Sequence, residues 1–177
     1  PLLCAAKSTS SFLYSVFFVI SFISLDCVIF FVSTSVFSFF FLQVRVPEAW
    51  KVFYGIDAEG NATPKKLHVY KNAETEFDIF HKAGITICYY EDAKQYCLIK
   101  AIYEDVKDIE PFTLGKYCWS GFSCKSFGYP YIMLETNEKT DRVLVMLLLE
   151  NAENKISFSD GDVQAIMESI VAGRREE

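Results

Sequence analysis

Apolar and polar positions alternate with a period of two through much of the chain, which is typical of β-strands. The clearest stretch is Gly84–Tyr103, in which Ile85–Tyr90 and Gln95–Tyr103 alternate around a charged turn. This pattern predicts a hairpin of two strands. A two-residue loop at its centre would place Cys88 opposite Cys97, where antiparallel strands come closest. The sequence leaves two interpretations of this pair open, a disulfide or two buried thiols.

Further strands are predicted on both sides of this hairpin. Arg142–Glu150 is apolar at consecutive positions, which predicts a central strand covered on both faces. Glu104–Lys116 is acidic and contains Pro111, so we expect a short helix or a covering loop there. The expected strands outside the hairpin are Ala49–Ile56, Leu67–Lys71, Glu76–Phe80, Tyr131–Glu135 and Arg142–Glu150.

A helix is predicted near the end of the chain. Ser159 is the expected N-cap, and Asp160 and Asp162 would complement the helix dipole in the first turn. Gly173 would end the helix. Its expected buried stripe, at helical spacing, comprises Val163, Ile166, Met167, Ile170 and Val171.

The first part of the chain differs from the rest in composition. Ser11–Leu42 is almost wholly apolar or Ser, with Asp26 as its single charge, and exceeds the roughly 20 residues that span a bilayer. A spanning helix at Phe12–Phe31 or Val28–Leu42 is one interpretation. A signal peptide and, for the residues before Val44, a translated intron rich in pyrimidine codons are the others. We therefore divide the chain into an apolar segment, residues 1–45, and a globular domain, residues 46–177.

Charge and the scarcity of catalytic motifs exclude several functional classes. The 177 residues carry a formal net charge of −6, which argues against nucleic acid as a partner. The two histidines have no Ser-His-Asp spacing, and there is no glycine-rich phosphate loop. The sequence therefore predicts neither an enzyme nor a cofactor.

Two short motifs suggest covalent features of an extracellular protein. Cys118 and Cys124 lie in an aromatic, Gly-bearing stretch, where a local disulfide would staple a loop. A zinc site would need two more ligands, and neither His68 nor His81 has the required spacing, so no metal is expected. Asn61-Ala62-Thr63 is a glycosylation acceptor in an extracellular setting.

Two stretches resemble the BRICHOS family, in particular its chondromodulin and tenomodulin branch. The first is KKLHVYKNAETEFDIFHKAGITICYYEDAKQYCLIKAI, in which Gly84–Thr86 and Cys97–Ala101 match two family signatures. The second is RVLVMLLLENAENKISFSDGDVQAIMESI, which resembles the later strand, link and final helix of that family. The resemblance covers about residues 64–172. The family has an Asp just before the Gly-Ile-Thr strand start, and the only candidate for it here, Asp78, lies two residues too far upstream. The chain also has no Cys in the final helix, where Met167 lies.

The resemblance implies a fold, a location and a function. The fold would be α+β, an antiparallel sheet of about five strands with a helix on each face. The domain would lie in the lumen or outside the cell, as part of a single-pass membrane or secreted precursor anchored through residues 11–42. It would act as a chaperone-like domain that shields unfolded or β-prone segments, including those of its own precursor. The residues expected to contact such clients are Tyr89, Tyr96, Tyr103, Ile85, Ile87 and Ile99.

The sequence leaves alternatives open for the pairing of the cysteines and for the function of the domain. The family disulfide does not carry over, and pairing Cys88 with Cys97 and Cys118 with Cys124 is favoured because each closes a local loop. The alternative function is a small secreted β-rich carrier of an apolar ligand, which would need a closed barrel around a cavity.

Overall fold

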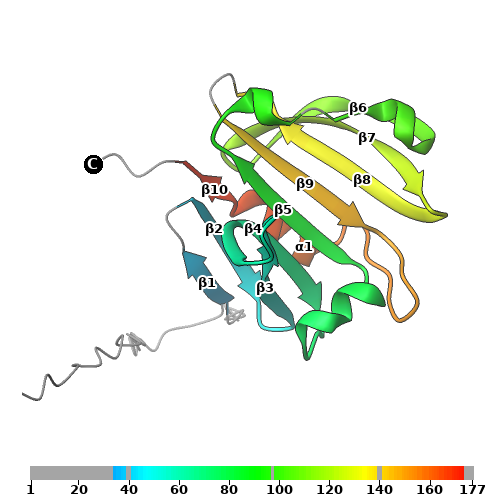
Figure 1. Ribbon diagram of the computed structural model, residues 1–177. Coiled ribbons are helices and arrows are strands. Elements are labelled where there is room, and N and C mark those ends of the chain that lie inside the picture. Colours follow the sequence, from blue (N-terminus) through cyan, green and yellow to red (C-terminus); the bar gives the residue numbers. More distant parts are fainter. Residues whose placement is uncertain (1–33, 39–40, 97, 139–140, 174–177) are drawn as a thin grey trace, which may run out of the picture. The chain divides into compact units, whose positions relative to one another are not determined.

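A computed structural model describes residues 34–38, 41–96, 98–138 and 141–173 (Figure 1). These residues belong to one compact unit that begins at Val32. Within them, ten strands form two sheets, and one α-helix follows the ninth strand. The described part of the chain is therefore mostly β-structure.

The larger sheet has seven strands, all antiparallel, in the order β3-β4-β5-β9-β8-β7-β6. Its strands are β3 (Trp50–Ile56), β4 (Ala62–Lys71), β5 (Gly84–Tyr90), β6 (Glu104–Leu114), β7 (Tyr117–Ser126), β8 (Tyr129–Thr136) and β9 (Arg142–Leu148). The smaller sheet has the order β1-β2-β10 and comprises β1 (Thr34–Ser38), β2 (Leu42–Pro47) and β10 (Val171–Ala172).

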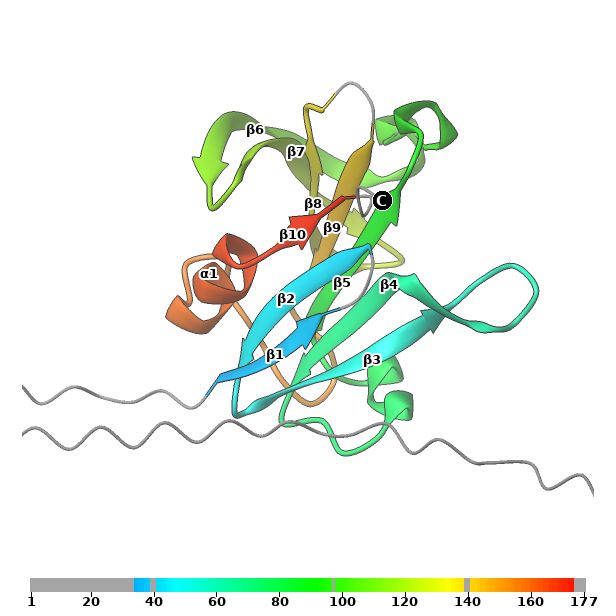
Figure 2. The ribbon, with the colours of Figure 1, turned by 90° about the vertical axis from the view of Figure 1, so that its left-hand side faces the viewer.

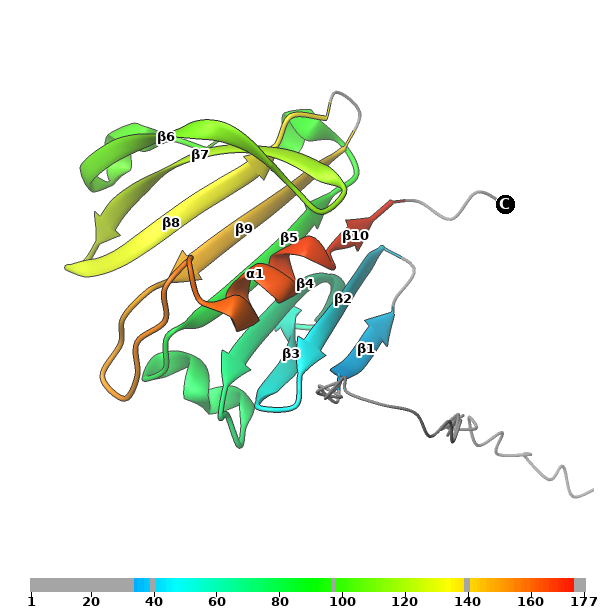
Figure 3. The ribbon, with the colours of Figure 1, turned by 180° about the vertical axis from the view of Figure 1, so that it is seen from behind.

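The helix α1 (Gly161–Glu168) and the smaller sheet cover one face of the larger sheet, which we call the core face (Figures 2 and 3). Apolar side chains from both layers meet there, because each layer has one apolar side to remove from water. The most completely buried core-face residues of the central strands are Leu67, Val69, Ile85, Ile87, Val145 and Leu147.

Several sequence predictions are confirmed. β5 begins and ends within one residue of the predicted strand, and β9 lies centrally between β5 and β8. Val163, Ile166 and Met167 of α1 are fully buried, as the helical stripe predicted. The helix itself is shorter than expected. Asp160, not Ser159, is its N-cap, and the chain leaves the helix after Glu168 to pair β10 with β2.

The expected α+β fold with a helix on each face is wrong. The larger sheet has seven strands, and α1 is the one α-helix within the described ranges. The difference arises because Glu104–Leu114 and Tyr117–Ser126, predicted as covering segment and loop, form β6 and β7. An edge strand exposes polar side chains and tolerates a proline such as Pro111, so its composition is similar to that of a loop.

The expected hairpin at Gly84–Tyr103 is also wrong in its second strand. The chain after β5 forms two short 3-10 turns, η2 (Ala93–Gln95) and η3 (Lys100–Ile102). β5 pairs instead with β4 and β9, because β9 offers a longer apolar partner. The expected strand at Glu76–Phe80 is the 3-10 helix η1.

The domain begins earlier in the chain than Val46. β2 contributes Leu42 and Val44 to the core, each with 1% of its surface exposed. Thr34–Ser38, inside the predicted alternative span Val28–Leu42, is a strand paired with β2. The alternative span at Phe12–Phe31 lies outside the described residues. Of the helices that the structure describes, none is both long and apolar enough to cross a membrane.

Candidate functional site

The second face of the larger sheet, which we call the open face, lies on the side away from α1 (Figure 1). Rows of side chains cross it in the register of the strands. The middle row comprises Phe53, His68, Thr86, Met146, Met133, Phe122 and Asp108. The flanking rows comprise Tyr70, Gly84, Leu148, Tyr131 and Cys124 on one side, and Lys66, Cys88, Leu144, Glu135 and Ser120 on the other.

A hydrogen-bonded group occupies the β4–β5 part of this face. The Nδ1 atom of His68 lies 2.9 Å from Oγ1 of Thr86, and Tyr70 also shares a hydrogen bond with Thr86. Burial, followed by the nearby Lys66 ammonium, lowers the pKa of His68 to about 4. Burial raises the pKa of Tyr70 to about 12. Both side chains are therefore uncharged at neutral pH.

Gly84 is required beneath this group. The ring of Tyr70 lies across it, and a Cβ at Gly84 would come within 2.4 Å of Tyr70 Cδ1. A glycine in a strand interior often marks such a close approach. The Tyr70 ring thereby covers the Gly84 backbone, which has no side chain of its own to shield it from water.

The cysteines of the described residues are free. Cys88 and Cys124 are buried on the open face, and Cys118 is exposed. Burial raises the pKa of the Cys88 thiol to about 11, which makes its thiolate scarce. The predicted pair of Cys118 and Cys124 is not formed, because both lie on β7 about 20 Å apart along an extended strand. Cys97 lies outside the described residues, and the neighbours of Cys88 across the sheet are on β4 and β9.

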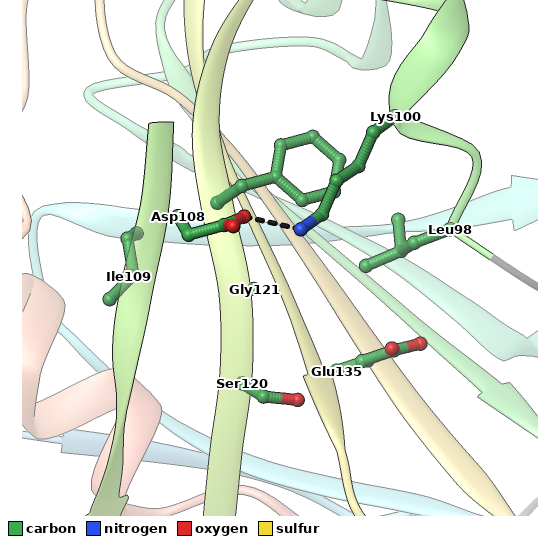
Figure 4. Close-up of a pocket in the computed structure, with 8 residues that line it drawn as sticks. Leu98, Lys100, Asp108, Ile109, Ser120, Gly121 and Glu135 are labelled. Carbon is green, nitrogen blue, oxygen red and sulfur yellow. Dashed lines mark hydrogen bonds and ion pairs between the residues drawn. The ribbon is translucent and has the colours of Figure 1, made fainter. Parts of the chain in front are cut away.

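Figure 4 shows a hollow of about 240 Å³ between β6, β7, β8 and the chain after Leu98. Lys100 forms an ion pair with Asp108 and lies over the Phe122 ring, 5.7 Å from its centroid. Glu135 accepts a hydrogen bond from Nη1 of Arg142 at 3.0 Å. The charged groups that line the hollow are thus paired with one another or with a neighbour. These pairs hold the segment around Leu98 and Lys100 against β7 and β8. The hollow therefore has the character of a packing contact, without the features of a reactive centre.

Asp78, the candidate for the family's acidic position, holds the η1 segment. Its carboxylate accepts hydrogen bonds from the backbone N–H groups of Glu74 at 2.5 Å and Thr75 at 3.3 Å, and it lies 3.0 Å from Nε2 of His81. The backbone N–H of Glu74 is the main reason that the pKa of Asp78 is lowered. The residue acts as a structural cap of this turn.

The structure separates the expected client-binding residues into two groups. Ile85, Ile87 and Tyr89 point into the core face and are at most 2% exposed, so they cannot meet a client in the folded domain. The others lie in or beside the connection between β5 and β6. Tyr96 stacks on Tyr90, Tyr103 packs against Phe122, and Ile99 is 56% exposed.

The two edges of the larger sheet, which the sequence reasoning missed, differ in their protection. β6 carries four carboxylates, a proline and two register irregularities, all of which discourage another strand from pairing with it. β3 has one charged residue, Lys51, one register irregularity, between Tyr54 and Gly55, and no proline, and its only strand partner within the described residues is β4. Tyr54 and Ile56 of β3 are 43% and 63% exposed. Pro111 within an alternating acidic stretch is the sequence signal that would have identified β6 as an edge.

Asn61, the predicted glycosylation acceptor, lies in the exposed turn between β3 and β4. Its backbone N–H donates to Oδ1 of Asp57 at 2.8 Å. Modification at this position stays a prediction.

Comparison with known proteins adds little to this description. No family model and no curated protein matches the chain, so the BRICHOS resemblance stays untested. A crystal structure of a protein from Bacteroides thetaiotaomicron, determined at 1.50 Å, is similar with a TM-score of 0.44 and 10% sequence identity. The match covers 77% of this chain and 47% of that protein, so the chain spans about half its length. A likeness at this level carries no argument about fold or function.

Proposed function

We propose that the domain binds extended, β-prone segments of other chains, or of its own precursor, along the outer side of β3. This is a chaperone-like function without an enzymatic step. The observation that carries it is that the edge of β3 is much less protected than the edge of β6. An incoming strand would extend the larger sheet by main-chain hydrogen bonds.

The side chains of β3 suit such a partner. Val52 and Phe53 are half-buried, and Tyr54 and Ile56 are exposed. They would pack against alternate side chains of an added strand on both faces of the sheet. The edge therefore offers apolar contacts in addition to backbone groups.

Charge favours an acidic or neutral client. β3 and β4 contain no carboxylate, whereas β6 carries four and one lysine. The lysines of the two strands are Lys51, Lys65, Lys66 and Lys71. Lys65 and Lys71 are paired with Glu91 and Asp162, so the positive charge of this edge rests on Lys51 and Lys66. Lys51 also disfavours pairing of two β3 edges with each other.

The test uses the full chain at substoichiometric amounts with an acidic amyloid-forming peptide. We expect a longer lag before aggregation, and a smaller effect on a basic peptide of equal aggregation rate. Ile56→Asp should shorten the lag towards that of the peptide alone, because it removes an apolar contact and places a negative charge beside the acidic peptide. Phe77→Asp is the matched control, because Phe77 on η1 is 64% exposed and Ile56 is 63% exposed. An unchanged lag with the folded wild-type chain, or an equal loss in both variants, contradicts the proposal.

The alternative function, a carrier of an apolar ligand, finds less support. The larger sheet is open, with β3 and β6 at its two ends, so its strands do not close into a barrel. Saturable binding of a small apolar ligand by the wild-type chain, without any effect on peptide aggregation, would favour that alternative.

A further inference from the structure

The turn between β7 and β8 has an unfavourable residue at its tip. Ser126 pairs with Tyr129, so Phe127 and Gly128 form a two-residue loop, which projects at one end of the larger sheet (Figure 1). Their φ angles are 51° and 82°, and positive values at both positions define the type I′ turn. Asn-Gly is the favoured sequence for such a turn, and a bulky side chain at positive φ is strained.

Phe127 is also unfavourably solvated. Its side chain is 95% exposed, the highest value among the large apolar residues of the described chain. The other described non-glycine residues with positive φ are Asn72 and Asp105, which are residue types that tolerate it. Local rules of conformation and burial are both broken at one residue, and such sites are expected to be functional.

A hollow of about 560 Å³ lies directly beside this tip. Lys125, Tyr129 and Pro130 of the hairpin form one side, and Glu150 and Ala152 of the loop after β9 form the other. The backbone N–H of Leu149 donates to the carbonyl of Pro130 at 2.9 Å, which holds this loop against the hairpin. A protruding aromatic ring and a hollow large enough for one are therefore adjacent.

We propose that the full chain forms a two-fold symmetric dimer in which Phe127 of each copy occupies the hollow of the other. A two-fold interface needs a surface that is complementary to itself, with residue i meeting j and j meeting i. The tip and the hollow meet this requirement because they are adjacent on one surface, with Gly128 of the tip also lining the hollow, so a two-fold axis between them would place each tip at the hollow of the other copy. Lys125 and Glu150, on opposite sides of the hollow, are paired within the chain with Asp105 at 2.6 Å and Lys155 at 2.8 Å, so the rim of the hollow does not oppose entry of an apolar ring by charge.

This dimer is independent of strand capping at β3. The β7–β8 hairpin lies near the β6 end of the sheet, so the β3 edge of each copy stays open. The interface is centred on one aromatic side chain of each copy, Phe127, and we therefore expect a weak, concentration-dependent dimer.

The test is sedimentation equilibrium of the full chain in a mild detergent over a wide concentration range. Phe127→Asn should weaken dimerisation roughly 100- to 10,000-fold, because each dimer loses two buried Phe side chains and each contributes about 10- to 100-fold. The same variant should melt no lower than the wild type, because Asn-Gly suits the turn. Ala152→Trp, which fills the hollow, should weaken dimerisation as well.

Phe80→Asn is the control, because Phe80 on η1 is 77% exposed but lies outside the hairpin and the hollow. It should leave dimerisation unchanged, and all variants carry the same first 33 residues. The proposal is overturned if the wild-type chain stays monomeric, or if the Phe127→Asn variant dimerises as strongly as the wild type. Binding of a monomeric wild type to phosphatidylcholine vesicles, lost in Phe127→Asn, would instead assign the side chain to a lipid surface.

Discussion

The two faces of the seven-stranded sheet bury different kinds of side chain. The core face is mainly aliphatic, with Trp50, Tyr89 and Trp119 among its buried residues, and it is sealed by α1 and β2, so its central residues are fully buried. The open face carries aromatic rings, thiols, hydroxyls and His68, and most of these side chains keep part of their surface in water. The comparison shows that stability and surface chemistry are assigned to opposite sides of the same strands. Mutations on neighbouring residues should therefore have unequal effects.

Leu147 and Leu148 give the largest contrast. They are adjacent on β9, but Leu147 is fully buried on the core face and Leu148 is half-buried on the open face. Leu147→Ala should lower the free energy of unfolding by about 3–4 kcal/mol, whereas Leu148→Ala should cost about 1 kcal/mol. Chemical denaturation of both variants measures the difference. Equal losses would show that the open face is covered by another part of the chain.

Gly84 tests how tightly the open face is packed. Gly84→Ala should destabilise the domain by about 2 kcal/mol, because the new Cβ would displace the Tyr70 ring and would lie 2.7 Å from the carbonyl oxygen of Val69. Gly161→Ala at the start of α1 is the control, because no heavy atom lies within 4 Å of its Cβ position. It should change stability by a few tenths of a kcal/mol at most. A silent Gly84→Ala would mean that Tyr70 moves freely.

The third prediction is that His68 makes stability depend on pH. Its pKa is about 4 in the folded domain and 6.5 when unperturbed, so between these values the unfolded chain binds a proton that the folded chain does not. Stability is therefore complete above pH 6.5 and decreases as the pH falls towards 4. Because the side chain is partly exposed, we expect a loss of about 1–2 kcal/mol. Unfolding measured at both ends of this range should show it, and His68→Gln should remove it. A variant with the wild-type pH dependence would refute the role of His68.

The smallest effect is expected at the rim of the core face. Asp162 at the start of α1 accepts hydrogen bonds from Lys71 Nζ at 3.0 Å and Trp50 Nε1 at 3.2 Å. Because the ion pair is partly exposed, Asp162→Asn should cost only about 0.5 kcal/mol, and added salt should reduce the difference. Denaturation at low and high salt measures it. Lys155→Gln, which removes an ion pair within one loop, should be neutral, and a salt-independent loss in Asp162→Asn would assign its effect to Trp50 alone.

Local sequence patterns predicted the individual strands and the helix better than they predicted which strands pair with each other. The apolar run of β9 and the first part of the helical stripe, Val163, Ile166 and Met167, were predicted correctly because each depends on residues close in sequence. Val171, expected to be buried on the same helix, belongs to β10 and is 41% exposed. The partner of β5 was predicted wrongly, because the alternating chain directly after it satisfies the strand pattern as well as the consecutive apolar run of β9 does. Which of the two pairs with β5 depends on burial against α1 and β2, which lie far away in the sequence.

The candidate site was less predictable than the fold. Ile85 and Ile87 were expected to contact clients, but alternation alone does not say which face of a strand will be covered. The open edge of β3 has no sequence signature of its own, since an edge is defined by a missing neighbour. The exposed Phe127-Gly128 turn was overlooked because Phe is not a turn residue by composition.

The amino-acid sequence by itself determined that the chain is rich in strands, that β9 is central and that one amphipathic helix follows it. These features depend on periodicity and composition, which act over a few residues. Only the tertiary structure decided the order of the strands, the face that α1 covers and the edge that stays open. Those features depend on which distant surfaces exclude water from each other, and several pairings of the same strands satisfy the local pattern equally well.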